Sequence, residues 1–521
     1  MLYRNSVQGL YLRSAKVSFL LAGFLTVLTP LVSVHAETDR WSNVSDHQSF
    51  WGSKYQDPYR RDAYRPCPNR RHLDAVRRWN SIAIDASGLD HTPVRAGENR
   101  VFGEQVGPGR SSRAMAIVHI AMFDTITAVL GGYESYTDLE RCRVPVSLDL
   151  AVSQAAHDTL VALYPSQAAA LDAELQENLD DVPASDLKNA SIALGQTAAE
   201  TILAFRSQDG ANQPEVRVNV DWITNPAPGH WRQDPVSRHP LALGAHWSEC
   251  VPFVLETPSQ FRVPPPPALN SPRYTAAYNE VKRLGGDGIT TPTKRTLDQS
   301  RIGIFWAYDG TPSLCAPPRL YNQVAIQIAD QLGTDPVSLA RLLVLINVGM
   351  ADAGIAIWES KYFYDVWRPV TAIRESDPGT GPTRLGDGNP WTIGDPAWTP
   401  LGAPASNLTG PNFTPPFPAY PSGHAGFGGT LFQILRRFYR TDAVKFRLVS
   451  DEFNGVTRGN DGKIRPLIPR TYQSFTQAEE ENGQSRIYLG IHWSFDKTEG
   501  IIQGRKIGNY VFDNCFRTLR H

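Results

Sequence analysis

Residues 112–130 have the sequence SRAMAIVHIAMFDTITAVL, in which apolar side chains recur every three or four positions. That spacing is typical of an α-helix packed in a protein core. The same pattern predicts further helices over Asp149–Leu163, Ala184–Phe205, Thr296–Ala307, Leu320–Leu332, Val337–Tyr364, Ser422–Phe438 and Gln477–Asp496, the last extending toward Phe512. No strand-like alternation and no short internal repeat accompanies these segments, so we predict an all-α fold.

Two proline-rich stretches interrupt the helical pattern. Four consecutive prolines at 264–267 exclude helix and strand alike and indicate a spacer. The Gly/Pro-rich stretch 377–421 is far longer than an ordinary connection, which is typical of a loop that covers a functional site. We therefore predict an N-terminal arm over residues 37–110, an N-terminal helical half over 111–263, and a C-terminal helical half over 264–521 that carries the chemistry.

The composition excludes several classes of protein. The chain has 521 residues, and 51 Lys and Arg residues nearly balance 52 Asp and Glu residues, so the net charge is −1. Binding to nucleic acid or to an anionic membrane needs a basic face, and we expect neither partner. The five cysteines lie far apart without a Cys-x-x-Cys motif, which argues against a zinc ribbon or a c-type haem. No glutamate lies three positions before a histidine, which argues against a di-iron bundle.

The N-terminus predicts export. Basic residues precede an apolar stretch over 17–34, and Val34 and Ala36 are the small residues that suit signal-peptidase cleavage after position 36. The alternative is an uncleaved anchor, because the stretch is long for a signal peptide, but Pro30 and the polar residues after Ala36 favour cleavage. We predict a signal peptide over residues 1–36, a secreted or periplasmic protein, no second membrane-spanning segment, and no stable membrane contact after cleavage.

Three short clusters in the C-terminal half carry charged or nucleophilic side chains. The first is Lys361 with Arg368, which are seven residues apart, so both side chains can point off one face of a helix. A solvated surface is the alternative, because Asp365 could bridge the two cations by helical i,i+3 and i,i+4 pairs. From this pair alone, the solvated surface is the better interpretation.

The second cluster, residues 421–424, precedes an apolar helix. Ser422 and Gly423 would begin a helix whose free backbone amides can bind an anion, and His424 adds an imidazole. The glycine would let the anion come close to the backbone. The alternative is an ordinary serine N-cap with an exposed histidine, and in isolation a four-residue motif favours that interpretation.

The third cluster contains Ser485, Arg486, His492 and Asp496. At i,i+4 spacing, the carboxylate of Asp496 can orient His492 and select its tautomer, as expected of a histidine that presents one nitrogen to an electrophile. A simple surface pair is the alternative. Arg486 lies six residues before His492, about 120° away around a regular helix. Either this arginine reaches around the helix or Gly490 loosens the turn.

Together the clusters can surround one point with cations, a hydroxyl, a backbone amide and two imidazoles. Such a set suits a tetrahedral or trigonal-bipyramidal oxyanion, because three unpaired buried cations would otherwise be very unfavourable. The combined pattern is Lys, six residues, Arg-Pro; then Pro-Ser-Gly-His; then Ser-Arg, five residues, His, three residues and Asp. It resembles the signature shared by vanadium-dependent haloperoxidases and the phosphatidic-acid-phosphatase type 2 superfamily, which includes bacterial acid phosphatases.

Flanking segments resemble the haloperoxidase branch and, within it, the chloroperoxidases. They are residues 113–132, 305–312, 317–323, 358–369 and 415–429. The resemblance therefore covers most of the chain, from Arg113 to the C-terminus. It implies an all-α fold of two four-helix-bundle-like halves with long Gly/Pro-rich loops, and vanadate as the cofactor.

The resemblance also implies a role for each site residue. His492 would bond vanadium axially, and hydrogen bonds to the vanadate oxygens would come from Lys361, Arg368, Ser422, Gly423 and Arg486. His424 would be the acid/base for the incoming peroxide, which Lys361 would help to polarise. Asp309 would pair with Arg486, although its position before Gly310 also suits a turn aspartate.

Two aromatic residues bear on the choice of halide. Phe417 and Trp358 match positions that line the halide side in chloroperoxidases, whereas bromoperoxidases have histidine at the first of these. Phe417 therefore favours chloride competence by resemblance. Plain core packing explains an aromatic wall equally well.

Three hypotheses about function follow. The leading one is a secreted vanadium-dependent haloperoxidase that oxidises chloride or bromide with hydrogen peroxide to hypohalous acid, for transfer to a small organic acceptor. The main alternative is an exported acid phosphatase with His492 as nucleophile and His424 as general acid. The third is a non-catalytic oxyanion-binding protein, which would not need His424. Halide preference, natural organic substrate, oligomeric state and disulfide pairing stay open.

Overall fold

The computed structural model describes residues 47–57 and 75–519, which belong to one compact unit. The predicted signal peptide, residues 1–36, lies outside the described residues, and so does Cys67. Export and location therefore stay predictions. The other four cysteines, Cys142, Cys250, Cys315 and Cys515, are free thiols, so the described part of the chain contains no disulfide.

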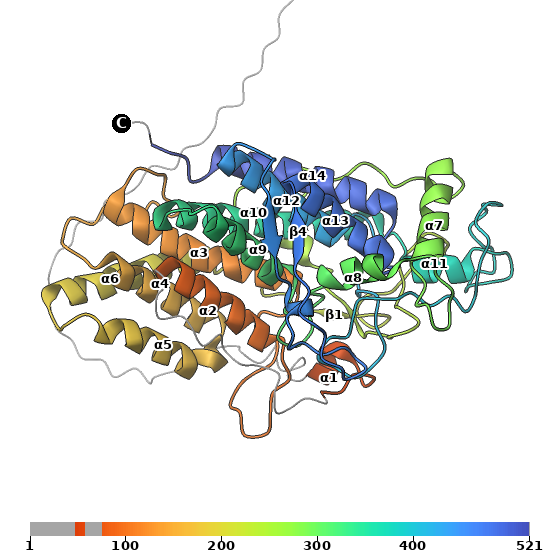
Figure 1. The fold of residues 1–521 in the computed structure, drawn as a ribbon, viewed down its shortest axis with the longest axis horizontal. Coiled ribbons are helices and arrows are strands. Elements are labelled where there is room, and N and C mark those ends of the chain that lie inside the picture. The colour runs from red at the N-terminus through yellow and green to blue at the C-terminus, as the bar shows by residue number, and fades with distance from the viewer. Residues whose placement is uncertain (1–46, 58–74, 520–521) are drawn as a thin grey trace, which may run out of the picture. The chain divides into compact units, whose positions relative to one another are not determined.

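Helices make up nearly all of the regular structure (Figure 1). The described residues form α1 (His47–Trp51), α2 (Ala75–Asp90), α3 (Pro108–Leu130), α4 (Leu148–Leu163), α5 (Ala168–Asp180), α6 (Asp186–Phe205), α7 (Pro272–Leu284), α8 (Leu297–Phe305), α9 (Pro317–Gln331), α10 (Pro336–Tyr364), α11 (Pro369–Glu375), α12 (Gly423–Tyr439), α13 (Phe475–Tyr488) and α14 (Ser494–Asn514). Two antiparallel pairs of short strands are β1 (Val216–Arg217) with β2 (Leu241–Ala242), and β3 (Phe446–Leu448) with β4 (Arg470–Tyr472). The predicted all-α class is confirmed.

The helices predicted from apolar spacing are present within a few residues, with one correction. Residues 477–496 do not form a single helix, because α13 ends at Tyr488 and α14 begins at Ser494. Between them Gly490 has φ +75°, and a Cβ at this position would lie 2.5 Å from the carbonyl oxygen of Gly285. Only glycine fits this break. Apolar spacing does not predict α1, α2, α5, α7 and α11. Helices α1 and α11 have only five and seven residues, α5 buries only Leu171 and Leu175, and α2 buries the charged residues Arg78 and Asp90.

Part of the predicted N-terminal arm is helical and contributes to the core. Helix α2 lies within residues 37–110, and its Trp79 and Ala83 side chains are fully buried. The helix packs against α3, α4 and α9. Residues 264–267 form neither helix nor strand, as their prolines predict. The division into an arm and two halves stays a prediction.

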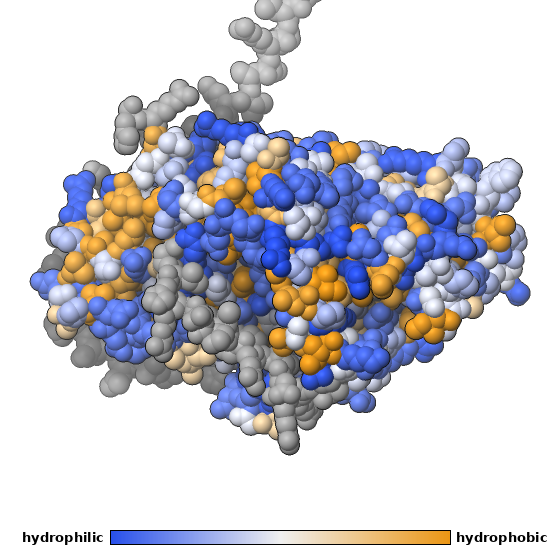
Figure 2. All heavy atoms as spheres, viewed as in Figure 1, coloured by the Kyte–Doolittle hydropathy of each residue, from blue (hydrophilic) through white to orange (hydrophobic). Residues whose placement is uncertain are grey.

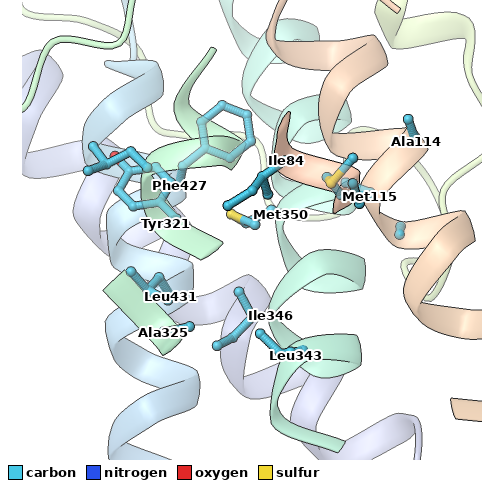
Figure 3. Close-up of a cluster of buried hydrophobic side chains, with 14 of the residues drawn as sticks. Ile84, Ala114, Met115, Tyr321, Ala325, Leu343, Ile346, Met350, Phe427 and Leu431 are labelled. Atoms are coloured by element: carbon cyan, nitrogen blue, oxygen red, sulfur yellow. The ribbon is translucent and has the colours of Figure 1, made fainter. Parts of the chain in front are cut away.

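Helix α10 is the central helix of the C-terminal part, and it is apolar on nearly every side. Asp335 caps its first turn by accepting hydrogen bonds from the backbone amides of Val337 and Ser338. It packs against α3, α9, α12 and α14. Figure 3 shows Ile346 and Met350 of α10 among side chains from these neighbours, including Met115 and Phe427. This packing fixes where the two ends of α10 lie.

Two helices are long and apolar enough to cross a membrane, contrary to the expectation of no second span. They are α3 and α10. The most apolar 18-residue segment of α3 is 83% buried inside the protein, and that of α10 is 94% buried. A helix that buries its apolar face against other helices is a core helix, which explains the composition without a membrane. Figure 2 shows polar side chains over much of the visible surface, interrupted by smaller apolar patches.

Helices α12 and α14 pack in close contact because small residues face each other. A Cβ on Gly504 would lie 2.1 Å from the carbonyl oxygen of Gly426, so a larger residue would push the helices apart. The close approach aligns their N-terminal ends, where the Ser422 amide donates to the carbonyl oxygen of Asp496 at 3.1 Å. The two sequence clusters that begin these helices are therefore neighbours.

The Gly/Pro-rich stretch 377–421 contains no helix and no strand, as predicted. It is held by backbone hydrogen bonds, such as Gly402 N to Leu489 O at 2.8 Å and Ala403 N to Phe413 O at 2.8 Å. The first of these joins the loop to the break between α13 and α14. Its last part, 413–421, is buried and leads directly into α12.

Candidate active site

The predicted site residues come from distant parts of the chain and meet at helix ends. Lys361 lies in the last turn of α10, and Arg486 lies in the last turn of α13. Arg368 precedes α11, Ser422 precedes α12, and His492 precedes α14. Helix ends leave backbone amides and carbonyls free to bind other groups, so such a meeting point suits a polar site.

These helix ends enclose a small cavity of about 40 Å³. Predicted site residues that line it are Trp358, Phe417, Gly423, His424, Arg486 and His492, together with Asp309. This volume holds a small ion or a few water molecules rather than a large organic substrate. Residues of the second and third clusters therefore share one cavity, whereas Lys361, Arg368 and Ser422 are not among its lining residues.

Lys361 is fully buried and binds three carbonyl groups. Its Nζ donates to Pro418 O at 2.9 Å, Ala419 O at 3.0 Å and Pro421 O at 2.6 Å. These contacts use all three ammonium hydrogens. Burial, and then the neighbouring Arg368 cation, hold the pKa of Lys361 well below its usual value. Lys361 thus positions the segment before α12 and adds positive charge, while its hydrogen bond to vanadate stays a prediction.

Arg368 keeps one guanidinium nitrogen without a partner. Its Nε donates to Phe417 O, and its Nη1 donates to Ile491 O and to His492 Nε2, each at 2.9 Å. Nη2 is buried and makes no hydrogen bond. An unsatisfied charged donor in the interior is unfavourable unless a ligand binds it. Burial accordingly lowers the pKa of Arg368.

His492 presents an unprotonated nitrogen to the site. Its Nδ1 donates to Asp496 Oδ2 at 2.8 Å, which leaves the Nε2 lone pair to accept from Arg368. The same carboxylate oxygen accepts from the Trp493 amide at 3.0 Å. Burial, and then the nearby cations led by Arg368, hold the pKa of His492 far below its usual value. The orienting role predicted for Asp496 agrees with this geometry.

Arg486 reaches the site because the helix breaks before His492. Since α13 ends at Tyr488, the two residues do not share one helical surface, and the 120° offset of a regular helix does not apply. The predicted ion pair with Asp309 is present, with Nη2 donating to Oδ1 at 2.6 Å and Nη1 to Oδ2 at 3.1 Å. Arg486 Nε is buried without a partner.

His424 is the second residue of α12, and a hydrogen bond defines the tautomer of its ring. Its Nε2 donates to the carbonyl oxygen of Ala307, which leaves Nδ1 as the basic nitrogen. Its own carbonyl oxygen accepts from Tyr321 Oη at 2.9 Å and from Asn482 Nδ2 at 2.8 Å. Burial, and then Arg486, lower the pKa of His424 well below its usual value. The residue is buried, which contradicts the alternative of an exposed histidine.

Ser422 and Gly423 form the start of α12. Ser422 Oγ accepts from the Ala425 amide at 3.4 Å, so the serine is an N-cap. Gly423 lines the cavity, and a Cβ there would lie 3.6 Å from the ring of Trp358. A side chain at this position would fill the space beside the helix N-terminus, where an anion would lie.

The site has an excess of positive charge. Lys361, Arg368 and Arg486 are each at most 1% exposed, and the carboxylates beside them are Asp309 and Asp496. Burial raises the pKa of Asp496 to about 7, which further limits the negative charge available. Buried cations outnumber carboxylates, and both arginines have an unpaired N–H. These features fit a small oxyanion as the missing partner.

An aromatic wall closes one side of the cavity. The rings of Trp358 and Phe417 lie 4.8 Å apart between centroids, and Trp358 Nε1 donates to Leu243 O at 2.9 Å. Lys361 Nζ lies 5.1 Å from the centre of the Phe417 ring. Both aromatic residues line the cavity as predicted, and they also pack with each other. Their role in halide choice stays a prediction.

Sequence patterns do not identify several residues at the site. Two of them line the cavity: Trp51, at the end of α1, and His239, in the irregular loop before β2. Tyr321 and Asn482 anchor His424 from α9 and α13. None of these four lies in a motif with a defined spacing, because they reach the site only through tertiary packing. Tyr321 belongs to a flanking segment of the family resemblance, which is the one available signal.

Replacing Asp309 by asparagine is expected to destabilise the protein by about 3 kcal/mol, because breaking a buried ion pair leaves the other charge uncompensated. The Asp309 side chain is 6% exposed and its Arg486 partner 1% exposed. Urea unfolding of Asp309→Asn and wild type measures the difference. The exposed pair Arg217–Asp221 gives a matched control, and Asp221→Asn should show no measurable loss. Equal effects of the two substitutions would contradict the prediction.

Comparison with known proteins agrees with this geometry. A family model described as VCPO second helical-bundle domain matches residues 341–521. The vanadium chloroperoxidase of Curvularia inaequalis is 30% identical over 514 aligned residues, which cover 82% of this chain and 80% of that protein. The relationship extends to both halves of the chain, well beyond the region that the family model matches.

Two solved structures share the fold. The first bacterial vanadium-dependent iodoperoxidase has a TM-score of 0.65 and 24% identity, covering 85% of this chain and 97% of that one. A holo-type bacterial vanadium-dependent chloroperoxidase has a TM-score of 0.58 and 17% identity, covering 81% and 95%. Together with the 30% identical relative and the cavity of cations and imidazoles, these matches show that the chain belongs to the vanadium-dependent haloperoxidase family.

Proposed function

We propose that this protein binds vanadate in the cavity at the start of α12 and uses hydrogen peroxide to oxidise chloride or bromide to hypohalous acid. One observation carries the proposal. The unprotonated Nε2 of His492 and unpaired N–H groups of Arg368 and Arg486 are buried together beside the N-terminus of α12. Vanadate is an oxyanion that accepts a nitrogen ligand and hydrogen bonds at once, so this donor set fits it.

The residues present have distinct tasks in this proposal. His492 would bond vanadium through Nε2, in place of the hydrogen bond that this nitrogen accepts from Arg368, and Asp496 fixes it as the unprotonated nitrogen. Arg368, Arg486 and the Gly423 amide would hydrogen-bond the oxygens, with Asp309 holding Arg486 in position. Vanadate, when bound, supplies a Lewis acid toward peroxide without changing oxidation state.

Proton transfer would belong to His424. Its Nε2 is held by Ala307 O, so Nδ1 is the nitrogen available to take a proton and return it. Burial, and then Arg486 and Lys361, lower the pKa of His424, so an added anion nearby would raise this pKa again. Hydrogen peroxide, halide and a small organic acceptor are the proposed partners.

The same cavity could accept phosphate, and this is the reason to keep acid phosphatase as the second candidate. His492 Nε2 is unprotonated and could attack phosphorus, with the arginines stabilising the transferring group. The aromatic wall of Trp358 and Phe417 favours the haloperoxidase, because a phosphoester site gains little from two apolar rings beside the anion.

One set of assays distinguishes the two activities. Purified protein is tested for oxidation of bromide, chloride and iodide with hydrogen peroxide, and for phosphomonoester hydrolysis, before and after loading with orthovanadate. We expect halide oxidation that depends on vanadate. Rapid ester hydrolysis that vanadate inhibits, with no vanadate-dependent halide oxidation, would support the phosphatase. Iodide turnover without bromide or chloride turnover would contradict the proposed halide class.

We also propose export, which N-terminal sequencing of the secreted or periplasmic protein would test.

A further inference from the structure

Two polar side chains outside the predicted site line the same cavity without a hydrogen-bond partner. They are Trp51, at the end of α1, and His239, in the loop before β2. Each is 1% exposed, and the indole Nε1 of Trp51 and the imidazole Nε2 of His239 make no hydrogen bond. Their rings lie 5.4 Å apart between centroids. A buried N–H without an acceptor is unfavourable, so two of them on one cavity need an explanation.

Both nitrogens are hydrogen-bond donors. An indole N–H can only donate. His239 Nδ1 accepts from the Leu241 amide at 3.4 Å, which places the ring proton on Nε2. Burial lowers the pKa of His239 to about 3, so the imidazole is neutral at working pH. Two residues that line the cavity therefore each have a neutral N–H donor without an acceptor.

The surroundings favour a small, weakly hydrated anion as that acceptor. The rings that pack against these two residues and also line the cavity are apolar: Phe50 lies 5.1 Å from His239 and Phe413 lies 4.7 Å from Trp51, between ring centroids. Arg486 lines the same cavity, and the excess positive charge of the candidate site attracts anions. The cavity is too small for an organic acceptor. A hydrated, multiply charged oxyanion would lose more solvation here than neutral donors restore.

We propose that His239 and Trp51 form an outer halide subsite, in which the anion accepts hydrogen bonds from both ring nitrogens before it moves to the oxidation site. This inference rests on the proposed haloperoxidase function. The residues of this subsite line the same cavity as Phe417, His424 and His492. It is a separate feature from the Trp358 and Phe417 wall, since Trp51 and His239 precede the proline spacer at 264–267 and the wall residues follow it.

Steady-state kinetics test the subsite with variants that remove one donor each. His239→Phe and Trp51→Phe keep an aromatic ring and lose the N–H, and His239→Gln keeps an N–H donor. We expect the KM for bromide to rise about tenfold in each phenylalanine variant, the effect of losing one hydrogen bond to a charged group. The KM for hydrogen peroxide and kcat at saturating bromide should change little. His239→Gln should recover most of the bromide affinity.

A matched control separates halide binding from loss of packing. His119 on α3 is also 1% exposed, but its ring nitrogens are hydrogen-bonded with Met115 O and the side-chain amide of Asn80. His119→Phe should lower the thermal stability and leave the KM for bromide unchanged. If His239→Phe also leaves the bromide KM unchanged, the two donors serve packing alone and the proposal is wrong.

A structural readout does not depend on turnover or on the variants folding. Crystals of the wild-type protein are soaked in bromide, and anomalous scattering locates the ion. We expect a peak within hydrogen-bond distance of His239 Nε2 and Trp51 Nε1, and its absence overturns the subsite. A peak in a protein that shows no vanadate-dependent halide oxidation would keep the anion site and reject the reaction. Vanadate-dependent halide oxidation without the peak would support the reaction and reject the anion site.

Discussion

His492→Ala is expected to abolish vanadate binding and halide oxidation. His492 lines the cavity together with Arg486, and its unprotonated Nε2 accepts a hydrogen bond from Arg368. Loss of a residue that only orients a metal ligand lowers metal affinity by about 10- to 100-fold, and loss of the ligand itself should exceed that range. Calorimetric titration with orthovanadate measures the affinity, and bromide oxidation measures activity.

Two further variants make this result specific. Asp496→Asn should weaken vanadate binding by about 10- to 100-fold, because the partner of His492 Nδ1 no longer carries the charge that selects the tautomer. His157 provides the matched control: it hydrogen-bonds with Asp158 and Asp172 and lies on α4 outside the cavity. His157→Ala should retain full vanadate affinity. Unchanged vanadate affinity in His492→Ala would refute the assignment of the metal ligand.

His424→Ala is expected to lower kcat for halide oxidation by about 10²- to 10⁴-fold, the range of a lost general acid/base. The substitution removes the Nδ1 base but no donor assigned to the vanadate oxygens, so vanadate affinity should fall far less than in His492→Ala. His424 is anchored through its main chain by Tyr321 and Asn482, which keeps the start of α12 in place. Activity and vanadate titration of the same preparation separate the two effects.

The outcome for His424 also decides between classes of protein. Undiminished halide oxidation in His424→Ala would reject its proton-transfer role. If the wild-type protein binds vanadate with neither halide oxidation nor ester hydrolysis, and His424→Ala binds it equally well, the chain is an oxyanion-binding protein. His424→Gln sharpens the test, because glutamine can still donate to Ala307 O but cannot exchange a proton.

The helices and the composition of the site follow from the sequence to a large extent. Apolar spacing identifies α3, α10 and α12 because each buries a wide face over several turns. It joins α13 and α14 into one helix, since both flanks of Gly490 continue the helical pattern. The break depends on the contact between Gly490 and Gly285, some two hundred residues apart in sequence. Local spacing contains no information about that contact.

The roles of individual donors depend on tertiary structure in the same way. Lys361 is identified from its spacing to Arg368, but the carbonyl groups that bind its ammonium lie in the loop before α12. His239 and Trp51 have no motif at all, and their shared position becomes visible only when the cavity is closed. Long-range packing decides which of a side chain's donors are already used.

The sequence alone determines the all-α class, the candidate residues of the site, and the i,i+4 pairing of His492 with Asp496, because periodicity and short spacings are local properties of the chain. Tertiary structure alone decides which N–H groups remain unpaired, the tautomers of His424 and His492, and the meeting of the N-terminal Trp51 and His239 with the vanadate site. Hydrogen bonding and burial are set by neighbours distant in sequence, and these neighbours are chosen by the packing of the whole core.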